Sequence, residues 1–259
     1  MKYFVADAFT SERFKGNPAG VCILDEWPDD DVMQNIAFEN NLAETAFVVP
    51  REDYYDLRWF TPEEEIDLCG HATLASAFIL MNFIDQSTSE IEFHTQSGIL
   101  SVKKKEDLYE MDFPSRKPYK IDVSPIIQEA IGVAPLEVYQ SRDLLVLLQT
   151  ETQVKTLAPD FEQMKKIPGC FAVIVTAKGD EVDFVSRFFA PGAGIPEDPV
   201  TGSSHSTLIP FWAERLGKDK MTARQLSRRG GTLYCENLNE RVKISGNAVL
   251  YSKGEIFTE

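Results

Sequence analysis

One short pattern occurs twice in this chain of 259 residues, and this repetition constrains the fold more than any other feature. The first copy spans residues 58–74 and the second spans residues 187–208. Each copy reads as a strand, a proline turn, an acidic residue, a glycine among small or polar neighbours, and then an apolar helix. Two such units in one chain predict two similar halves, with half of a site in each.

The helix that follows each glycine is the expected centre of its half. The helix predicted over residues 71–83 is apolar on almost every side, and a helix without a polar face is a buried one. We therefore expect strands to wrap around it. The second helix, predicted over residues 203–216, contains Pro210, which should either kink the helix or mark a late start.

The order of elements in residues 1–113 resembles the order in residues 122–255. Each half ends in a predicted three-strand meander, and the segment Pro114–Pro118, with two prolines and no large apolar side chain, reads as a linker. We expect an N-terminal lobe of residues 1–115 and a C-terminal lobe of residues 116–259, with a last strand that can return to the first lobe.

Composition excludes several classes of partner. A hydrophobic content of 43% is enough to fill a core, and the net charge of −15 argues against nucleic acid and anionic membranes, which select basic surfaces. The four cysteines lie far apart without a Cys-x-x-Cys pair, so neither a zinc ribbon nor a disulfide framework is indicated. With no signal peptide and no membrane-spanning run, we expect a cytoplasmic protein.

The two helix starts are candidate anion sites. The first N–H groups of a helix lack internal partners and carry partial positive charge, and Gly70 and Gly202 would let the backbone approach a ligand closely. Such a terminus suits a carboxylate or a developing enolate. The alternative is that the glycines, Ser203 and the preceding acidic residues only cap the helices. Asp198, in a loop rich in glycine and proline, favours a functional role.

Three further side chains carry acid–base chemistry in principle. His71 stands at a helix start, where the dipole disfavours its charged form, so a neutral ring could exchange a proton. Glu44 has apolar neighbours and would be a competent base if buried, or an ordinary exposed residue at a strand start if not. Cys69 directly precedes Gly70 and is either a thiol activated by the helix or a buried structural cysteine.

Together these segments resemble the PhzF-like proteins, a family named for an isomerase of phenazine biosynthesis. The matching segments follow the family's order over nearly the whole chain, with Val200 and Ser204 standing where alanine is more usual. They are Phe14-Lys-Gly-Asn-Pro-Ala-Gly-Val21, Asn41-Leu-Ala-Glu-Thr-Ala-Phe47, Trp59-Phe-Thr-Pro, Asp67-Leu-Cys-Gly-His-Ala-Thr-Leu-Ala75, Arg187-Phe-Phe-Ala-Pro, Glu197-Asp-Pro-Val-Thr-Gly-Ser-Ser-His205 and Trp212-Ala-Glu-Arg-Leu-Gly217.

The resemblance implies the α+β fold of diaminopimelate epimerase, with two similar lobes. Each lobe would be a barrel-like, mostly antiparallel sheet wrapped around a central apolar helix, with the active site in the cleft between the lobes. The resemblance also implies a catalytic Glu44 supported by His71, Asp198 and Ser203. It implies no metal, no organic cofactor, a small acidic substrate and a homodimer.

The related epimerases and racemases use two cysteines, one from each lobe. Here Cys69 occupies the first position and Thr201 the second, so a mechanism with two thiols is broken, although both residues stay candidates for contact with the substrate. This favours a cofactor-independent isomerase in which Glu44 moves a proton within the substrate. The alternatives are an amino-acid epimerase or racemase that uses Cys69, and a non-catalytic protein that binds a small acid.

Overall fold

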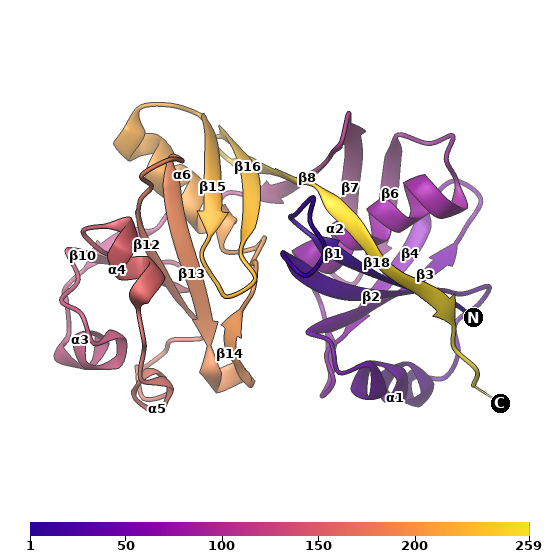
Figure 1. The fold of residues 1–259 in the computed structure, drawn as a ribbon, viewed down its shortest axis with the longest axis horizontal. Coiled ribbons are helices and arrows are strands. Elements are labelled where there is room, and N and C mark those ends of the chain that lie inside the picture. Colours follow the sequence, from indigo (N-terminus) through magenta and orange to yellow (C-terminus); the bar gives the residue numbers. More distant parts are fainter. Residues whose placement is uncertain (259) are drawn as a thin grey trace. The chain divides into compact units, whose positions relative to one another are not determined.

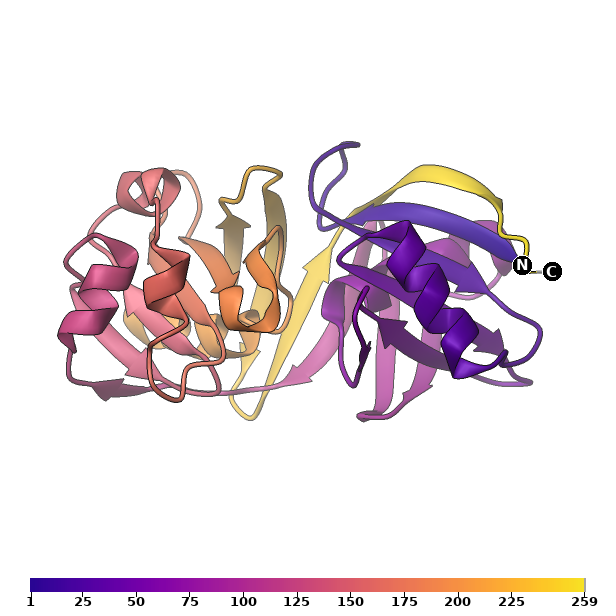
Figure 2. The same ribbon diagram turned by 90° about the horizontal axis from the view of Figure 1, so that it is seen from below.

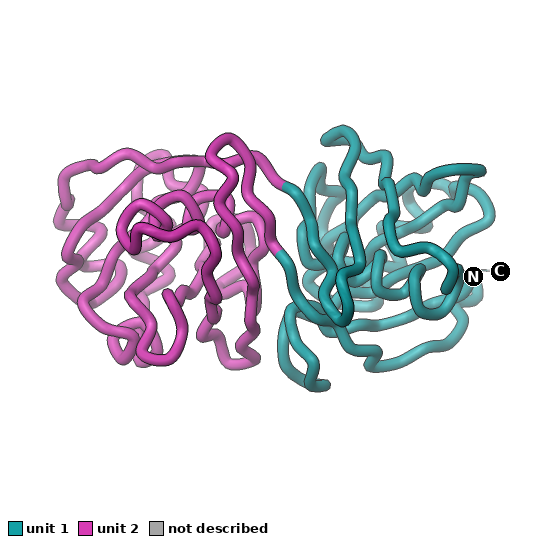
Figure 3. Tube along the Cα trace, turned by 90° about the horizontal axis from the view of Figure 1, so that it is seen from above, with its two compact units in different colours: residues 1–112, 245–259 teal, residues 113–244 magenta. Residues whose placement is uncertain are grey.

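The computed structural model describes residues 1–258, which form 18 strands and six α-helices together with one π-helical and one 3₁₀ turn (Figure 1). This confirms the predicted α+β class. The chain divides into two compact units (Figure 3). Unit 1 comprises Met1–Asp112 with Ser245–Glu259, and unit 2 comprises Phe113–Ile244. That the two units are alike and barrel-shaped stays a prediction.

In unit 1, β1 is the antiparallel neighbour of both β2 and β18, and the first and last strands of the chain run side by side (Figure 2). β2 pairs with β3 in parallel, and β3 pairs with β4 in antiparallel orientation. Strands β6, β7 and β8 form the predicted meander. The bounds are β1 Lys2–Ala8, β2 Asn17–Ile23, β3 Glu44–Pro50, β4 Tyr55–Phe60, β5 Glu65–Ile66, β6 Glu90–Thr95, β7 Gly98–Lys105, β8 Leu108–Pro114 and β18 Ala248–Glu255.

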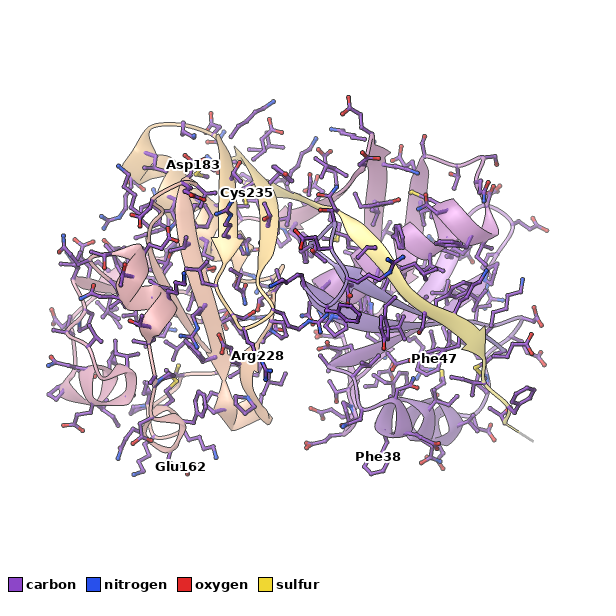
Figure 4. All side chains as sticks on the ribbon, in the orientation of Figure 1. Phe38, Phe47, Glu162, Asp183, Arg228 and Cys235 are labelled. Carbon is purple, nitrogen blue, oxygen red and sulfur yellow. The ribbon has the colours of Figure 1, made fainter. Side chains whose placement is uncertain are left out.

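Helix α2 (Gly70–Ile79) fills the interior of unit 1, as its apolar sequence predicts. All but one of its residues are buried, and it packs against β1, β2, β3 and β18. The expected helix over residues 71–83 continues as a π-helical turn, Leu80–Ile84. Helix α1 (Asp30–Asn40) covers a cluster of buried apolar side chains that includes Phe47 (Figure 4). No helix in residues 1–258 has the length and apolar character needed to cross a membrane.

In unit 2, β11 and β12 are parallel, and β13 lies between β12 and β15. Three short helices pack on the same unit, and one of them, α4, lies outside the elements predicted from the sequence. The bounds are β9 Tyr119–Ile121, α3 Pro125–Ile131, β10 Glu137–Gln140, β11 Leu144–Leu147, α4 Glu151–Thr156, α5 Phe161–Met164, β12 Val173–Lys178, β13 Phe184–Ala190, β14 Ile195–Asp198, α6 His205–Leu216, β15 Lys220–Gln225, β16 Gly231–Leu238 and β17 Arg241–Gly246.

Helix α6 runs through Pro210 without interruption, so the proline does not mark a late start. A proline has no N–H to donate to the carbonyl four residues earlier, here that of Ser206. The backbone N–H of Arg116 donates to this carbonyl instead, at 2.8 Å. The acceptor that the proline would orphan is therefore satisfied, and the buried helix tolerates Pro210.

Candidate active site

The predicted site residues form two groups, one in each unit, and each group is compact. The unit 1 group is Glu44, Cys69, Gly70 and His71. The unit 2 group is Asp198, Thr201, Gly202 and Ser203.

Glu44 is the first residue of β3, and the fold buries its carboxylate against the start of α2. The residue is only 8% exposed, so the alternative of an ordinary exposed glutamate is wrong. Its Oε2 atom lies 3.1 Å from Nε2 of His71. The ring N–H is not aligned for a hydrogen bond, and neither buried atom has a hydrogen-bond partner among residues 1–258. A carboxylate and an imidazole thus face each other with unused hydrogen-bonding capacity.

The opposite edge of the His71 ring faces Asn17 and Cys69. The Asn17 Nδ2 atom lies 3.1 Å from Nδ1, and the Cys69 Sγ atom lies 3.5 Å from it. An amide N–H that donates to Nδ1 leaves the proton of a neutral ring on Nε2, toward Glu44. A doubly protonated ring would require the Asn17 amide to turn its oxygen to Nδ1.

Asn17 is a site contact that the sequence argument missed. The run Gly16-Asn17-Pro18 reads as a turn, yet Asn17 is the fully buried first residue of β2, paired with Ala8 of β1. The only signal for it in the sequence is its place in a segment that matches the PhzF-like pattern.

The protonation of this group differs from the expectation for isolated helix-start residues. Burial lowers the pKa of His71, but Cys69 and Glu44 outweigh burial and raise that pKa well above its usual value. The helix dipole, which favours a neutral ring, is outweighed by these two neighbours. Burial, followed by the charge of Glu44, raises the pKa of the Cys69 thiol instead of lowering it. The pKa of His71 and that of Cys69 are therefore set by their shared burial beside Glu44.

The same three side chains offer one oxygen, one sulfur and one nitrogen atom within 4.8 Å of one another. Such donors suit Zn²⁺. The imidazole, however, stands between the other two groups, with Nε2 toward Glu44 and Nδ1 toward Cys69. One ring nitrogen cannot face both partners in this orientation, so a metal held by all three would require the ring to rotate. A metal-free site stays a prediction.

The unit 2 group lies between the end of β14 and the start of α6. Asp198 ends β14, and its Oδ2 atom accepts a hydrogen bond from the Thr201 hydroxyl. Helix α6 begins at His205, so Gly202 and Ser203 form a turn before it rather than its first residues. The Ser203 hydroxyl makes no hydrogen bond among the described residues, while Gln225, which no sequence pattern marks, contacts both Asp198 and Thr201.

An internal ion pair anchors the strand that carries Asp198. The Arg187 guanidinium donates two parallel hydrogen bonds to Glu197, at 2.6 and 3.0 Å, and a further one to the carbonyl of Leu157 at 2.7 Å. The Arg187 side chain is only 11% exposed. Paired planar groups of this kind fix both distance and orientation, so they hold the residue next to Asp198 in place.

Comparison with known proteins agrees with the resemblance. Residues 6–254 match the PhzC-PhzF family, described as phenazine biosynthesis-like protein. An uncharacterised isomerase of Pseudomonas aeruginosa is 49% identical over 253 residues, covering 98% of this chain and 97% of that protein. The crystal structure of a PhzF-family phenazine biosynthesis protein from Enterococcus faecalis superposes with a TM-score of 0.98 at 50% identity, over 99% of both chains.

A more distant likeness bears on the fold alone. A probable proline racemase from Agrobacterium radiobacter is 9% identical, with a TM-score of 0.67 over 100% of this chain and 93% of that one. The architecture is thus shared with this probable racemase at a level of sequence identity that shows the fold alone. From the family match and the isomerase relatives, the chain belongs to the PhzC-PhzF family of phenazine biosynthesis-like proteins and is an isomerase.

Proposed function

We propose that this isomerase moves a proton within a small carboxylate-bearing substrate, with Glu44 as the base and without a cofactor. Glu44 would take a proton from a carbon next to a carboxylate or an unsaturated system. The C–H bond breaks, an O–H bond forms on Glu44, and the electron pair moves into the unsaturated system. Return of the proton at another carbon completes the shift of the double bond and regenerates the carboxylate.

The observation that carries this proposal is the close, buried pair of Glu44 and His71, whose facing atoms make no aligned hydrogen bond. Buried polar atoms in folded proteins nearly always have hydrogen-bond partners, and exceptions call for an explanation. Glu44 Oε2 and His71 Nε2 are both buried, 3.1 Å apart and without hydrogen bonds among the described residues. A substrate that supplies a proton to one atom and accepts one from the other would satisfy both.

The remaining predicted residues are assigned supporting roles. The backbone N–H groups at Gly70 and Gly202 and the Ser203 hydroxyl would stabilise the negative charge that develops on the substrate. Either His71 or Asp198, which is held by Thr201, would relay the proton. Single acid–base groups contribute about 10²–10⁴-fold, so the charge-stabilising donors must supply much of the remainder.

An epimerase or racemase that uses Cys69 is the second candidate, favoured by the 3.5 Å contact between Cys69 Sγ and His71. Two observations count against it: the raised pKa of the thiol, and Thr201, which cannot act as a base near neutral pH, in the second position. The isomerase assignment sets aside the non-catalytic alternative.

The test is deuterium incorporation from heavy water into a panel of small cyclic and unsaturated acids. Wild-type protein is compared with Glu44→Gln and with Glu39→Gln, the same change at an exposed site in unit 1. We expect exchange by the wild type and Glu39→Gln and at least ~100-fold slower exchange by Glu44→Gln. Equal exchange by all three proteins would remove Glu44 from the mechanism.

A further inference from the structure

A buried glutamine holds the segment that carries the unit 2 group. Gln225, the last residue of β15, is fully buried. Its Oε1 atom accepts from the Thr201 backbone N–H at 2.9 Å. Its Nε2 atom donates to the Asp198 carbonyl at 2.7 Å and to the Thr201 hydroxyl at 3.2 Å. One primary amide thus uses its acceptor and both of its donor hydrogens on a stretch of four residues.

These bonds set the direction of the hydrogen bond that Asp198 receives. The Thr201 oxygen accepts from Gln225 Nε2, so its own hydrogen is free to donate to Asp198 Oδ2. The three groups form a series of donors that runs from the amide through the hydroxyl to the carboxylate. In a buried series each bond polarises the next, so the amide strengthens the bond to the carboxylate.

The carbonyl side of Thr201 is held as firmly as its N–H side. The Ser204 hydroxyl donates to the Thr201 carbonyl at 2.8 Å, and Nδ1 of His205 lies 2.9 Å from the same oxygen. Farther along, the Ser227 hydroxyl donates to the Pro199 carbonyl at 2.8 Å. Gly202 and Ser203 therefore follow a residue whose two backbone polar groups both have buried partners.

We propose that Gln225 is a positioning residue for the isomerase reaction, one that orients the Asp198 carboxylate and the Gly202–Ser203 turn through Thr201. The proposal rests on the function proposed above for Asp198 and Ser203. Gln225 itself is not assigned a contact with the substrate. An apolar residue or a glutamate at this position cannot accept one hydrogen bond and donate two, as the Gln225 amide does.

The first test uses turnover and its pH dependence. Gln225→Met removes the amide and keeps the length of the side chain, and Thr201→Val removes the hydroxyl while leaving Gln225 intact. We expect both variants to lower kcat by about 10- to 100-fold with a smaller change in KM, as displaced catalytic groups do. The acidic limb of the kcat profile should move to higher pH in Thr201→Val, because there the Asp198 carboxylate loses its hydroxyl donor.

Two matched controls separate positioning from general damage. Arg224→Gln alters the exposed neighbour of Gln225 on the same strand and is expected to retain the wild-type pH profile and kcat within a few-fold. Thr201→Ser keeps the hydroxyl, so it should recover most of the activity that Thr201→Val loses. A kcat unchanged in folded Gln225→Met protein, or a pH profile unchanged in folded Thr201→Val protein, would overturn the proposal.

The second test needs no substrate. It therefore tests the positioning role of Gln225 even when the proposed function is wrong. Amide hydrogen exchange read by NMR should show the Thr201 N–H exchanging at least ~10-fold faster in Gln225→Met than in the wild type. The Ala213 N–H, deeper inside α6, should keep its rate. Equal acceleration at both sites would show general loosening of unit 2 and would overturn a positioning role, as would no acceleration at Thr201. Faster exchange at Thr201 alone would support the positioning of this segment by Gln225. If no turnover then depended on Glu44, the proposed isomerase reaction would be refuted while the positioning role would stand.

Discussion

His205 predicts how the stability of unit 2 depends on pH. The residue is fully buried, its Nδ1 atom lies 2.9 Å from the Thr201 carbonyl, and its Nε2 atom has no hydrogen-bond partner among the described residues. Burial lowers the pKa of His205 from 6.5 to about 4, partly opposed by the Thr201 carbonyl. The folded state therefore holds a neutral ring at pH values where the unfolded chain is protonated.

The sign and size of the effect follow from these two pKa values. A depressed pKa means that the unfolded state binds more protons, so stability is fully present above pH 6.5 and falls as the pH drops toward 4. Each pH unit between these limits costs about 1.4 kcal/mol, or about 3 kcal/mol in total. Of this, about 2 kcal/mol should be lost between pH 7 and pH 4.5.

The assay compares urea unfolding of wild-type protein and His205→Asn at pH 7 and pH 4.5, read by exchange of α6 amide hydrogens. The variant should be less stable at pH 7 but should lose about 2 kcal/mol less than the wild type on acidification. An identical pH dependence in wild type and His205→Asn would refute the reasoning.

Three further predictions concern packing, the ion pair and the thiols. Gly246→Ala should lower the unfolding free energy by about 1–3 kcal/mol, because the added Cβ would lie 2.4 Å from Cδ1 of the buried Phe9. Gly254 has open space around it, so Gly254→Ala should change the unfolding free energy by less than about 0.5 kcal/mol. Equal unfolding free energies for the two variants would contradict this packing. Arg187→Met should cost about 3 kcal/mol in chemical unfolding because it leaves the half-buried Glu197 carboxylate unpaired, and a loss below 1 kcal/mol would contradict the anchoring role. Burial raises the pKa of Cys170 to about 11 and also raises the pKa of Cys69. An aromatic disulfide reagent at pH 8 should therefore titrate the four free thiols rapidly only after unfolding. Fast reaction of Cys69 in the native protein would show that its thiol is activated.

Local patterns in the sequence were sufficient for the elements that fill each unit. The apolar sequence of residues 71–83 predicts a buried helix because such a segment has no face for solvent, and α2 is that helix. Helix α4 was missed because its six residues show no apolar period. Its signal was the capping box, in which Thr150 and Gln153 bond each other's backbone N–H groups.

Long-range partners could not be found in the same way. Asn17 meets His71 across 54 residues, and Gln225 meets Thr201 across 24 residues, through strand pairings that no local period specifies. The sequence could not predict protonation states for the same reason, since the pKa of Cys69 and that of His71 depend on their burial beside Glu44. The homodimer and the cytoplasmic location stay predictions.

The central claim is that the proton belongs to Glu44 rather than to Cys69. The most direct measurement is the rate of deuterium incorporation into the accepted substrate by Glu44→Gln and Cys69→Ala, each relative to wild type in heavy water. We expect a loss of at least ~100-fold for Glu44→Gln and a rate within about 10-fold of wild type for Cys69→Ala. The reverse pattern, with Glu44→Gln active and Cys69→Ala inert, would contradict it and point to a thiol-based epimerase.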